Sequence, residues 1–252
     1  MWFFYICNRI YFSPMKIALF SDIHANLPAL ESFFRSVDQS KPDFIYCLGD
    51  LVGYNVWPNE VVNEIRKRMI STLSGNHDAA VGIDTEKISG SFTNQIINDD
   101  VRDYLLSLPN HIRLECTIQH KKRNVLFVHG SNRRNNEYIT EDLEDSYLLA
   151  LTNEARADIM CCGHTHKPFH RAIKTELGYK HVVNIGSLGK PKDGDVRGCY
   201  AVLELNTSSN LSSENGVSVN FIRFDYDYES AARAIEESIL PNSFANALRN
   251  AE

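Results

Sequence analysis

Short apolar runs that end in polar residues recur along this chain and constrain its fold more than any other feature of the sequence. They occupy the segments KIALFSD, DFIYCLGD, MISTLSGNHD, NVLFVHG, DIMCCGHTH and HVVNIGS. Each apolar part is short and often β-branched, as expected of strands that are buried on both faces. Each polar end would lie at the carboxyl edge of a strand, where functional groups gather in layered α/β sheets.

Segments with helical periodicity separate several of these predicted strands. Residues 27–40 place their apolar side chains on one stripe and tolerate Pro28 near the helix start. The same spacing predicts further helices over residues 59–69, 95–108, 141–156 and 228–240, and a short one over 242–250.

Strands without intervening helices follow His166. Residues 169–185 predict two strands with a turn near Gly178, and residues 199–205 and 217–226 predict two more. Consecutive strands indicate a second sheet packed against the first. We therefore predict one α/β domain over residues 15–252, with two sheets flanked by helices. We interpret residues 1–14 as an N-terminal extension or a mis-assigned start, because Met15 opens the first predicted strand.

The composition excludes several classes of protein. The net charge of −6 and the pI near 5.9 argue against a broad nucleic-acid surface. No apolar run approaches the roughly 18 to 20 residues that cross a bilayer. The six cysteines form no C-x-x-C pair, which predicts reduced thiols and a cytoplasmic protein. Cys161 and Cys162 lie in an apolar run and are expected to be strand core.

The polar strand ends supply the side chains that divalent cations bind. These residues are Asp22, His24, Asp50, Asn76, His77, Asp78, His129, His164 and His166. Parallel strands would bring these ends together, and imidazoles with carboxylates suit Mn²⁺, Fe²⁺ or Zn²⁺. Two metals roughly 3.5 to 4 Å apart clamp the attacking and leaving oxygens of a phosphoryl displacement. A carboxylate must bridge them, and Asp50 is the natural candidate because it follows a glycine in a tight turn.

The order D-x-H, GD, GNHD, H-G and GH-x-H resembles the calcineurin-like metallophosphoesterases, and it is most similar to their small single-domain phosphodiesterase branch in bacteria and archaea. The resemblance covers nearly the whole chain from Met15. It implies a four-layer α/β/β/α sandwich with two mixed β-sheets.

The same resemblance implies roles for the site residues by position. The first metal would be held by Asp22, His24 and His166, the second by Asn76, His129 and His164, and Asp50 would bridge them. His77 would face the phosphate and stabilise or protonate the leaving oxygen, and Asp78 would orient His77.

The segment NIGSLGKPKDGDVRG also resembles the family's region after the last ligands. Ile185 and Lys192 stand where the family often has Pro and Arg. Lysine cannot form the two-pronged contact of arginine, so substrate specificity is expected to differ. Ser187 is a candidate substrate-binding residue together with Asn76 and His77, although a plain turn explains this segment equally well.

The expected function is that of a phosphoesterase with two divalent metal ions, in the first place a phosphodiesterase in which a metal-bridging hydroxide attacks phosphorus. Mn²⁺ is the expected metal, with Fe, Zn or Ni as alternatives. The expected partner is a small phosphorylated substrate rather than a membrane, and a homo-oligomer is left open. A protein phosphatase or dinucleoside-polyphosphate hydrolase ranks second, because the Asp-Arg pair usual after their GD motif is missing. A scaffold that retained the fold ranks lower still, because every ligand position is filled.

Overall fold

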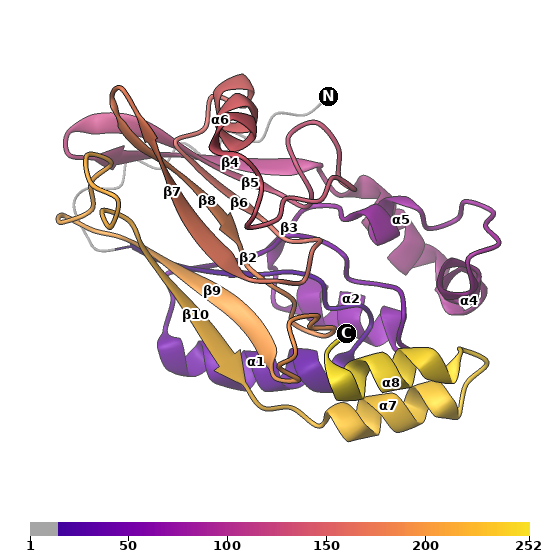
Figure 1. The fold of residues 1–252 in the computed structure, drawn as a ribbon. Coiled ribbons are helices and arrows are strands. Elements are labelled where there is room, and N and C mark those ends of the chain that lie inside the picture. Colours follow the sequence, from indigo (N-terminus) through magenta and orange to yellow (C-terminus); the bar gives the residue numbers. More distant parts are fainter. Residues whose placement is uncertain (1–14) are drawn as a thin grey trace.

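Two five-stranded β-sheets pack face to face in the structure, a computed structural model that describes residues 15–252 (Figure 1). The predicted extension, residues 1–14, lies outside the described residues. Sheet A contains, in spatial order, β10 (Ser218–Phe224), β9 (Gly198–Leu205), β1 (Met15–Phe20), β2 (Phe44–Cys47) and β3 (Ser71–Thr72). Sheet B contains β4 (His111–Ile118), β5 (Lys121–Val128), β6 (Ile159–Cys162), β8 (Gly178–Asn184) and β7 (Phe169–Thr175). Both sheets are mixed: β1, β2 and β3 run parallel in sheet A, as do β5, β6 and β8 in sheet B.

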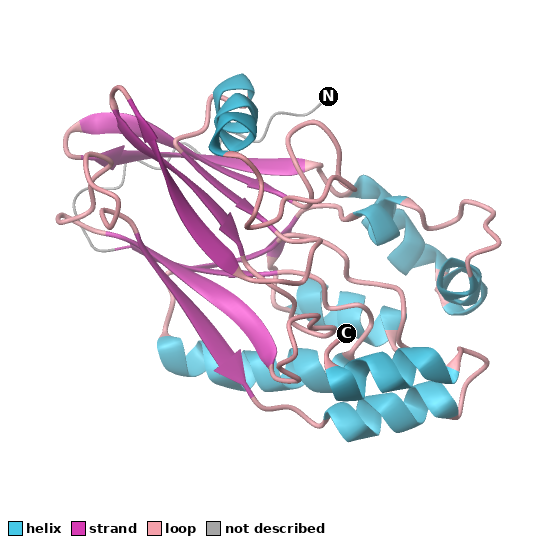
Figure 2. Ribbon diagram, in the orientation of Figure 1, coloured by secondary structure: helices cyan, strands magenta, loops and turns pink. Residues whose placement is uncertain are grey.

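Helices cover the outer faces of both sheets (Figure 2). The described residues contain α1 (Leu27–Ser40), α2 (Pro58–Lys67), α3 (Asn76–Ala79), α4 (Ile88–Ile96), α5 (Asp99–Ser107), α6 (Asp145–Glu154), α7 (Tyr228–Glu236) and α8 (Asn242–Asn250). One core joins α1, α2 and α5 to sheet A, a second lies between the sheets, and a third joins α6 to sheet B. These layers confirm the predicted α/β/β/α sandwich. Over residues 15–252, no helix combines the length and apolarity that a membrane crossing needs.

The central strand β1 shows why the apolar runs are continuous. Ala18 and Phe20 face the helices, whereas Ile17 and Leu19 face the core between the sheets. A strand that is buried on both faces needs apolar side chains at consecutive positions. Cys161 and Cys162 follow the same rule in β6, where both are fully buried, as the sequence predicts.

The later strands divide between the two sheets, instead of forming a second sheet of their own. β9 pairs antiparallel with β1 and so extends sheet A, whereas β7 pairs with β8 in sheet B. The strand β4 was not predicted, because it lies at an edge and all but one of its residues are partly or fully exposed.

The helix predicted over residues 95–108 is two helices, α4 and α5. Ile97 has an extended backbone (φ −76°, ψ 136°), and the backbone N–H of Asn98 donates to Oδ1 of Asn59 (2.8 Å). Asp99 and Asp100 then stand in the first turn of α5, where negative charge favours a helix start. The strand predicted in residues 69–78 is likewise shorter, because GNHD folds into the helical turn α3.

Candidate metal centre

The loops after β1 and β2 run side by side beyond the ends of their strands. The backbone N–H of Asp22 donates to the carbonyl of Gly49, and that of His24 to the carbonyl of Asp50, both at 3.0 Å. In sheet B, the N–H of Gly163 donates to the carbonyl of His129 (2.8 Å). The parallel pairing therefore continues into the loops and brings the polar strand ends together, as the sequence predicts.

Several residues of these loops adopt left-handed backbone conformations. The φ angles are 56° at Asp22, 51° at His24, 54° at Asp50, 68° at His164 and 62° at His166. Residues other than glycine rarely adopt this region, and such conformations concentrate at functional sites. The chain curls at each strand end, and this turns both side chains of D-x-H and of H-x-H into one cluster.

Two glycines let the loops after β2 and β3 approach each other closely. A Cβ atom on Gly49 would lie 2.3 Å from the backbone nitrogen of Gly75, and Gly49 also has a φ of 89°. A Cβ atom on Gly75 would lie 2.1 Å from Oδ1 of Asp50. The glycines of GD and GNHD are therefore required by the close packing around Asp50.

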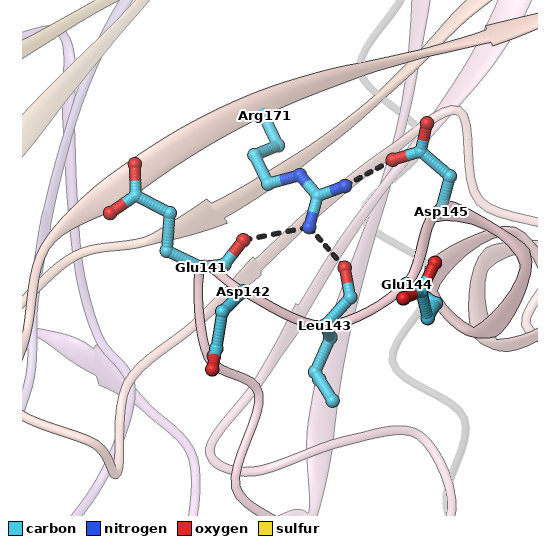
Figure 3. Close-up of a pocket in the computed structure, with 6 residues that line it drawn as sticks. All are labelled: Glu141, Asp142, Leu143, Glu144, Asp145 and Arg171. Carbon is cyan, nitrogen blue, oxygen red and sulfur yellow. Dashed lines mark hydrogen bonds and ion pairs between the residues drawn. The ribbon is translucent and has the colours of Figure 1, made fainter.

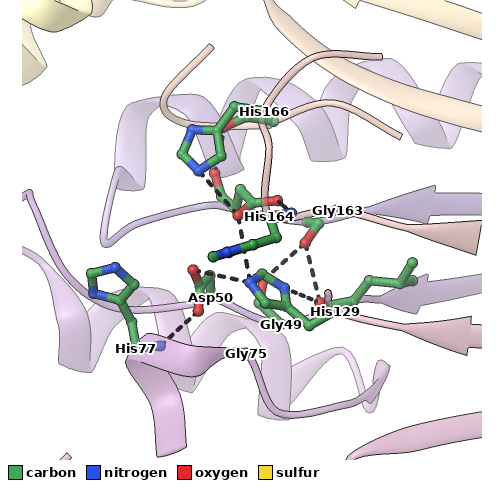
Figure 4. A network of polar contacts seen from close by, with 12 residues as sticks. Gly49, Asp50, Gly75, His77, His129, Gly163, His164 and His166 are labelled. Carbon is green, nitrogen blue, oxygen red and sulfur yellow. Dashed lines mark hydrogen bonds and ion pairs between the residues drawn. The ribbon is translucent and has the colours of Figure 1, made fainter. Parts of the chain in front are cut away.

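The imidazoles and carboxylates form overlapping buried clusters (Figure 4). The clusters are Asp22 with His24 and His166, His24 with Asp50 and His77, and Asp50 with His129 and His164. Oδ2 of Asp50 lies 3.2 Å from Nε2 of His129 and 3.8 Å from Nε2 of His24. Oδ1 of Asp22 lies 3.2 Å from Nε2 of His166. Asp50 thus belongs to two clusters, which is the position that a bridging carboxylate requires.

Backbone carbonyls orient the rings of three histidines. Nδ1 of His24 contacts the carbonyl of Val52 (3.0 Å), and Nδ1 of His129 contacts that of Leu48 (2.8 Å). Nδ1 of His166 contacts the carbonyl of Lys190. A carbonyl can only accept, so Nδ1 carries the proton in each ring and Nε2 points into the cluster. Metal-binding histidines are commonly oriented in this way.

Four atoms of the predicted ligands are buried and lack a hydrogen-bond partner. They are Oδ1 of Asp22, Oδ1 of Asn76, Nε2 of His129 and Nε2 of His164. Buried polar atoms are otherwise nearly always paired, so each such atom needs an explanation. Divalent cations would satisfy them, and the donor set fits the two metal ions that the sequence predicts.

The protonation states of the carboxyls and histidines in the clusters depend strongly on one another. Burial opposes ionisation of Asp22 and Asp50, but neighbouring histidines outweigh it and hold the pKa of both carboxyls below the usual range. Burial also opposes protonation of His129, yet Asp50 and Asp22 raise its pKa to about 10. Burial lowers the pKa of His24, His164 and His166. Without a cation, the proton on His129 therefore compensates the negative charge of the carboxylates. A metal ion that binds His129 must displace this proton.

The sequence model of the calcineurin-like phosphoesterase superfamily domain matches residues 15–208, a span that holds every one of these clustered residues. The chain belongs to the calcineurin-like phosphoesterase superfamily. The buried His/Asp clusters are consistent with the binuclear metal site typical of this superfamily.

Individual relatives agree with this membership. A protein of Methanocaldococcus jannaschii, MJ0912, is 30% identical over 244 residues, which cover 89% of this chain and 93% of the relative. The crystal structure of a metallophosphoesterase from Sphaerobacter thermophilus is 27% identical with a TM-score of 0.75, and the alignment covers 95% of this chain and all of that one. The protein PH1004 from Pyrococcus horikoshii OT3 shares the fold at 20% identity, with a TM-score of 0.76 over 93% of this chain and 97% of its own.

Asp78, which the sequence predicts to orient His77, binds the backbone of the loops around Asp50. Its carboxylate accepts hydrogen bonds from the backbone N–H groups of Asp50 (2.8 Å), Leu51 (2.9 Å) and Gly75 (2.9 Å), instead of contacting the ring of His77. Burial and the charge of Asp50 raise the pKa of Asp78 to about 7, while these N–H donors oppose the rise. Asp78 therefore positions the loop that carries Asp50.

The side chain of Ser187, a predicted substrate-binding residue, contacts the loops around Asp22. It is buried, and its hydroxyl donates to the carbonyl of Asp22 (2.8 Å) and accepts from the backbone N–H of Lys190 (2.9 Å). Both contacts are with the protein itself. The side chain thus supports the loop of Asp22, and the substrate contact of Ser187 stays a prediction.

His77 stands at the edge of the centre. Its backbone N–H donates to Oδ1 of Asp50 (2.8 Å), and its ring lies edge-on to His24 with the centroids 5.0 Å apart. Tyr54, which the sequence places directly after GDLVG, lies 4.9 Å from the ring of His77. Burial lowers the pKa of His77 to about 4, against the opposing charge of Asp50. The ring is therefore neutral near pH 7.

Sequence reasoning missed two residues beside the clusters. The ring of Tyr138 lies 4.3 Å from that of His164, although Tyr138 stands in a long loop with no motif. The side-chain amide of Asn184 donates to the carbonyl of Gly163 (2.7 Å) and to Oγ1 of Thr165 (2.9 Å), and so holds the GHTH loop. The polar end of HVVN was the available signal for Asn184, because the same pattern marked the other strand ends.

Proposed function

We propose that this chain is a phosphodiesterase that uses two divalent cations, with Mn²⁺ as the working metal. The observation that carries the proposal is the position of Asp50 between the clusters of His24 and of His129. In this proposal Asp22, His24 and His166 hold one cation, and Asn76, His129 and His164 hold the other. Two bound cations would neutralise charge on the phosphoryl oxygens and acidify the attacking water.

A phosphodiester suits the charge of the site better than a monoester does. The lowered pKa values of His24, His77, His164 and His166 keep these rings neutral near pH 7. These four histidines then add little positive charge to that of the metals, and a diester has one negative charge where a monoester has up to two. Lys192 interacts electrostatically with Asp22 and Asp50, although burial lowers its pKa.

His77 would act on the leaving oxygen. A neutral imidazole donates a hydrogen bond without giving up a proton, so its lowered pKa favours stabilisation of the leaving oxygen over proton transfer. Tyr54 packs against the ring of His77 and limits its orientation.

The test is hydrolysis of bis(p-nitrophenyl) phosphate and of p-nitrophenyl phosphate, with and without Mn²⁺. We expect Mn²⁺-dependent cleavage that favours the diester and falls at least about 100-fold in Asp50→Asn, as losses of transition-state charge stabilisation do. The matched control is Asp100→Asn, which removes an exposed carboxylate paired with Arg66 and should retain full activity. Preference for the monoester would refute the diesterase proposal, and metal binding without turnover of either ester would favour a scaffold.

The role of His77 has its own test. His77→Gln should lose more activity on diesters with basic leaving groups than on those with acidic ones, because only a basic leaving oxygen needs stabilisation. An equal loss across the series would show that His77 acts elsewhere.

The described cysteines are free thiols, which supports the proposed cytoplasmic location.

A further inference from the structure

A cavity of about 910 Å³ lies between β5, the C-terminal end of α6 and the loop 131–135. Leu126 and Val128 line it, and both belong to the core that joins α6 to sheet B. They lie on the face of sheet B that is opposite to the core between the sheets, where Val125 and Phe127 pack. None of the residues in the metal-binding clusters lines the cavity, and its volume is in the range of small-molecule sites.

The lining of this cavity is strongly basic. It includes Arg113, Arg133, Arg134 and Arg156, and Glu154 is the one carboxylate among the described residues that line it. Four arginines against one glutamate leave an excess of three positive charges, in a chain whose net charge is −6. Such a local concentration of positive charge attracts anions.

Two of the arginines that line the cavity, Arg113 and Arg133, are fixed by hydrogen bonds and an ion pair with other residues of the protein. Arg113 donates to the carbonyls of Ala155 (2.6 Å) and Arg156 (3.3 Å) at the end of α6. Arg133 forms a two-pronged ion pair with Glu154, with distances of 2.8 and 2.6 Å.

The other two arginines are available to a ligand. Among residues 15–252, no hydrogen bond or close ion pair holds the guanidinium groups of Arg134 and Arg156, and both side chains are exposed. Glu137 interacts electrostatically with Arg134 but does not line the cavity. Arg156 has a φ of 49°, a conformation that glycine usually supplies after a helix. Asn132 also lines the cavity. Guanidinium groups bind phosphate through paired hydrogen bonds.

A second hollow, of about 410 Å³, provides a contrast (Figure 3). Its arginine, Arg171, is bound to the carbonyls of Glu141 and Leu143 and to the carboxylate of Asp145. The carboxylates of Glu141, Asp142, Glu144 and Asp145 surround it, so this hollow would repel an anion.

We propose that the arginine-lined cavity beside α6 binds a phosphorylated small molecule of nucleotide size, with Arg134 and Arg156 contacting its phosphate groups. The loop 131–135 also reaches the metal centre, because the amide of Asn135 donates to the carbonyl of Gly75 (3.4 Å). A ligand in the cavity would thus hold a loop that contacts the residue before Asn76. The proposal does not depend on the phosphodiesterase activity.

The test is isothermal titration with ADP, and separately with inorganic phosphate, in EDTA so that no metal ion contributes. We expect one ADP per chain, and binding that weakens about 100-fold in Arg134→Ala/Arg156→Ala, at about tenfold for each guanidinium group removed. The control Arg35→Ala/Arg102→Ala removes two arginines from α1 and α5, and it should bind ADP within about twofold of the wild type. Binding should persist in Asp50→Asn, which places it outside the metal centre.

Three outcomes would overturn the proposal. The first is the absence of binding by ADP and phosphate at millimolar concentration. The second is ADP binding that is unchanged in Arg134→Ala/Arg156→Ala or abolished in Asp50→Asn. The third is self-association of the wild type that Arg134→Ala/Arg156→Ala abolishes, because the cavity would then be an interface between copies of the chain.

Discussion

The substitution Asp78→Asn tests whether one buried carboxylate holds the loop of Asp50. Oδ2 of Asp78 accepts from the N–H groups of Asp50 and Gly75, and Oδ1 accepts from those of Leu51 (2.9 Å) and Val52 (3.4 Å). An asparagine amide has one oxygen, so two of these N–H groups lose their acceptor whichever way it turns. Each buried donor left unpaired costs about 1–3 kcal/mol, which gives a total of about 4 kcal/mol. Asparagine also removes the buried charge of Asp78, whose pKa is raised to about 7, and this offsets part of the cost. For a domain of this size, a net cost of about 2 kcal/mol lowers the Tm by about 4–8 °C.

Urea unfolding and thermal melting, both in EDTA, measure this effect without a contribution from bound metal. Asp100→Asn is the matched control, because it removes an exposed carboxylate whose ion pair with Arg66 is worth less than about 1 kcal/mol. Mn²⁺ affinity should also fall by about 10- to 100-fold in Asp78→Asn, as for other residues that orient a metal ligand. If Asp78→Asn unfolds within about 1 kcal/mol of the wild type, the hydrogen bonds to Asp78 do not hold this loop.

Three other predictions concern buried positions. Gly75→Ala should weaken Mn²⁺ binding at least about tenfold by isothermal titration, because its Cβ would lie 2.1 Å from Oδ1 of Asp50; unchanged affinity would show that the loop can move aside. Burial lowers the pKa of His181 from 6.5 to about 4, so in this pH window the unfolded chain binds a proton that the folded chain does not. His181 should therefore contribute about 2 kcal/mol to the decrease in the free energy of unfolding between pH 7 and about pH 5, and urea titrations at the two pH values should give a decrease smaller by this amount in His181→Gln. Cys161 and Cys162 are fully buried, and burial raises the pKa of both thiols, so Ellman's reagent should modify them only in denaturant; rapid modification of the native protein would contradict their place in β6.

The sequence predicts the clustered residues well, because each directly follows an apolar run that can only be a buried strand. Asp22, Asp50 and His129 were found in this way, and parallel pairing explains why they meet. The role of Asp78 could not be predicted, since it depends on backbone N–H groups from another loop that no side-chain pattern reveals.

The fold could be predicted from the sequence only in part, for a similar reason. The two-sheet sandwich follows from runs buried on both faces, but the choice of partner strand depends on contacts between distant segments. β9 joins β1 across more than half of the chain, and nothing in either run distinguishes this pairing from one within sheet B. The edge strand β4 was missed because its partly exposed faces allow polar residues such as Arg113 and Glu115.

The way in which sheet A is divided along the chain has a consequence for biosynthesis. β1 is made first, but its neighbour β9 follows only after the whole of sheet B has been synthesised. Asp22 and Asp50 therefore leave the ribosome well before His164 and His166, and β1 keeps one unpaired edge until residues 198–205 emerge. Contacts of such long sequence separation form late in folding. A cation in the cell thus meets the completed cluster only after residues 198–205 have emerged and paired with β1.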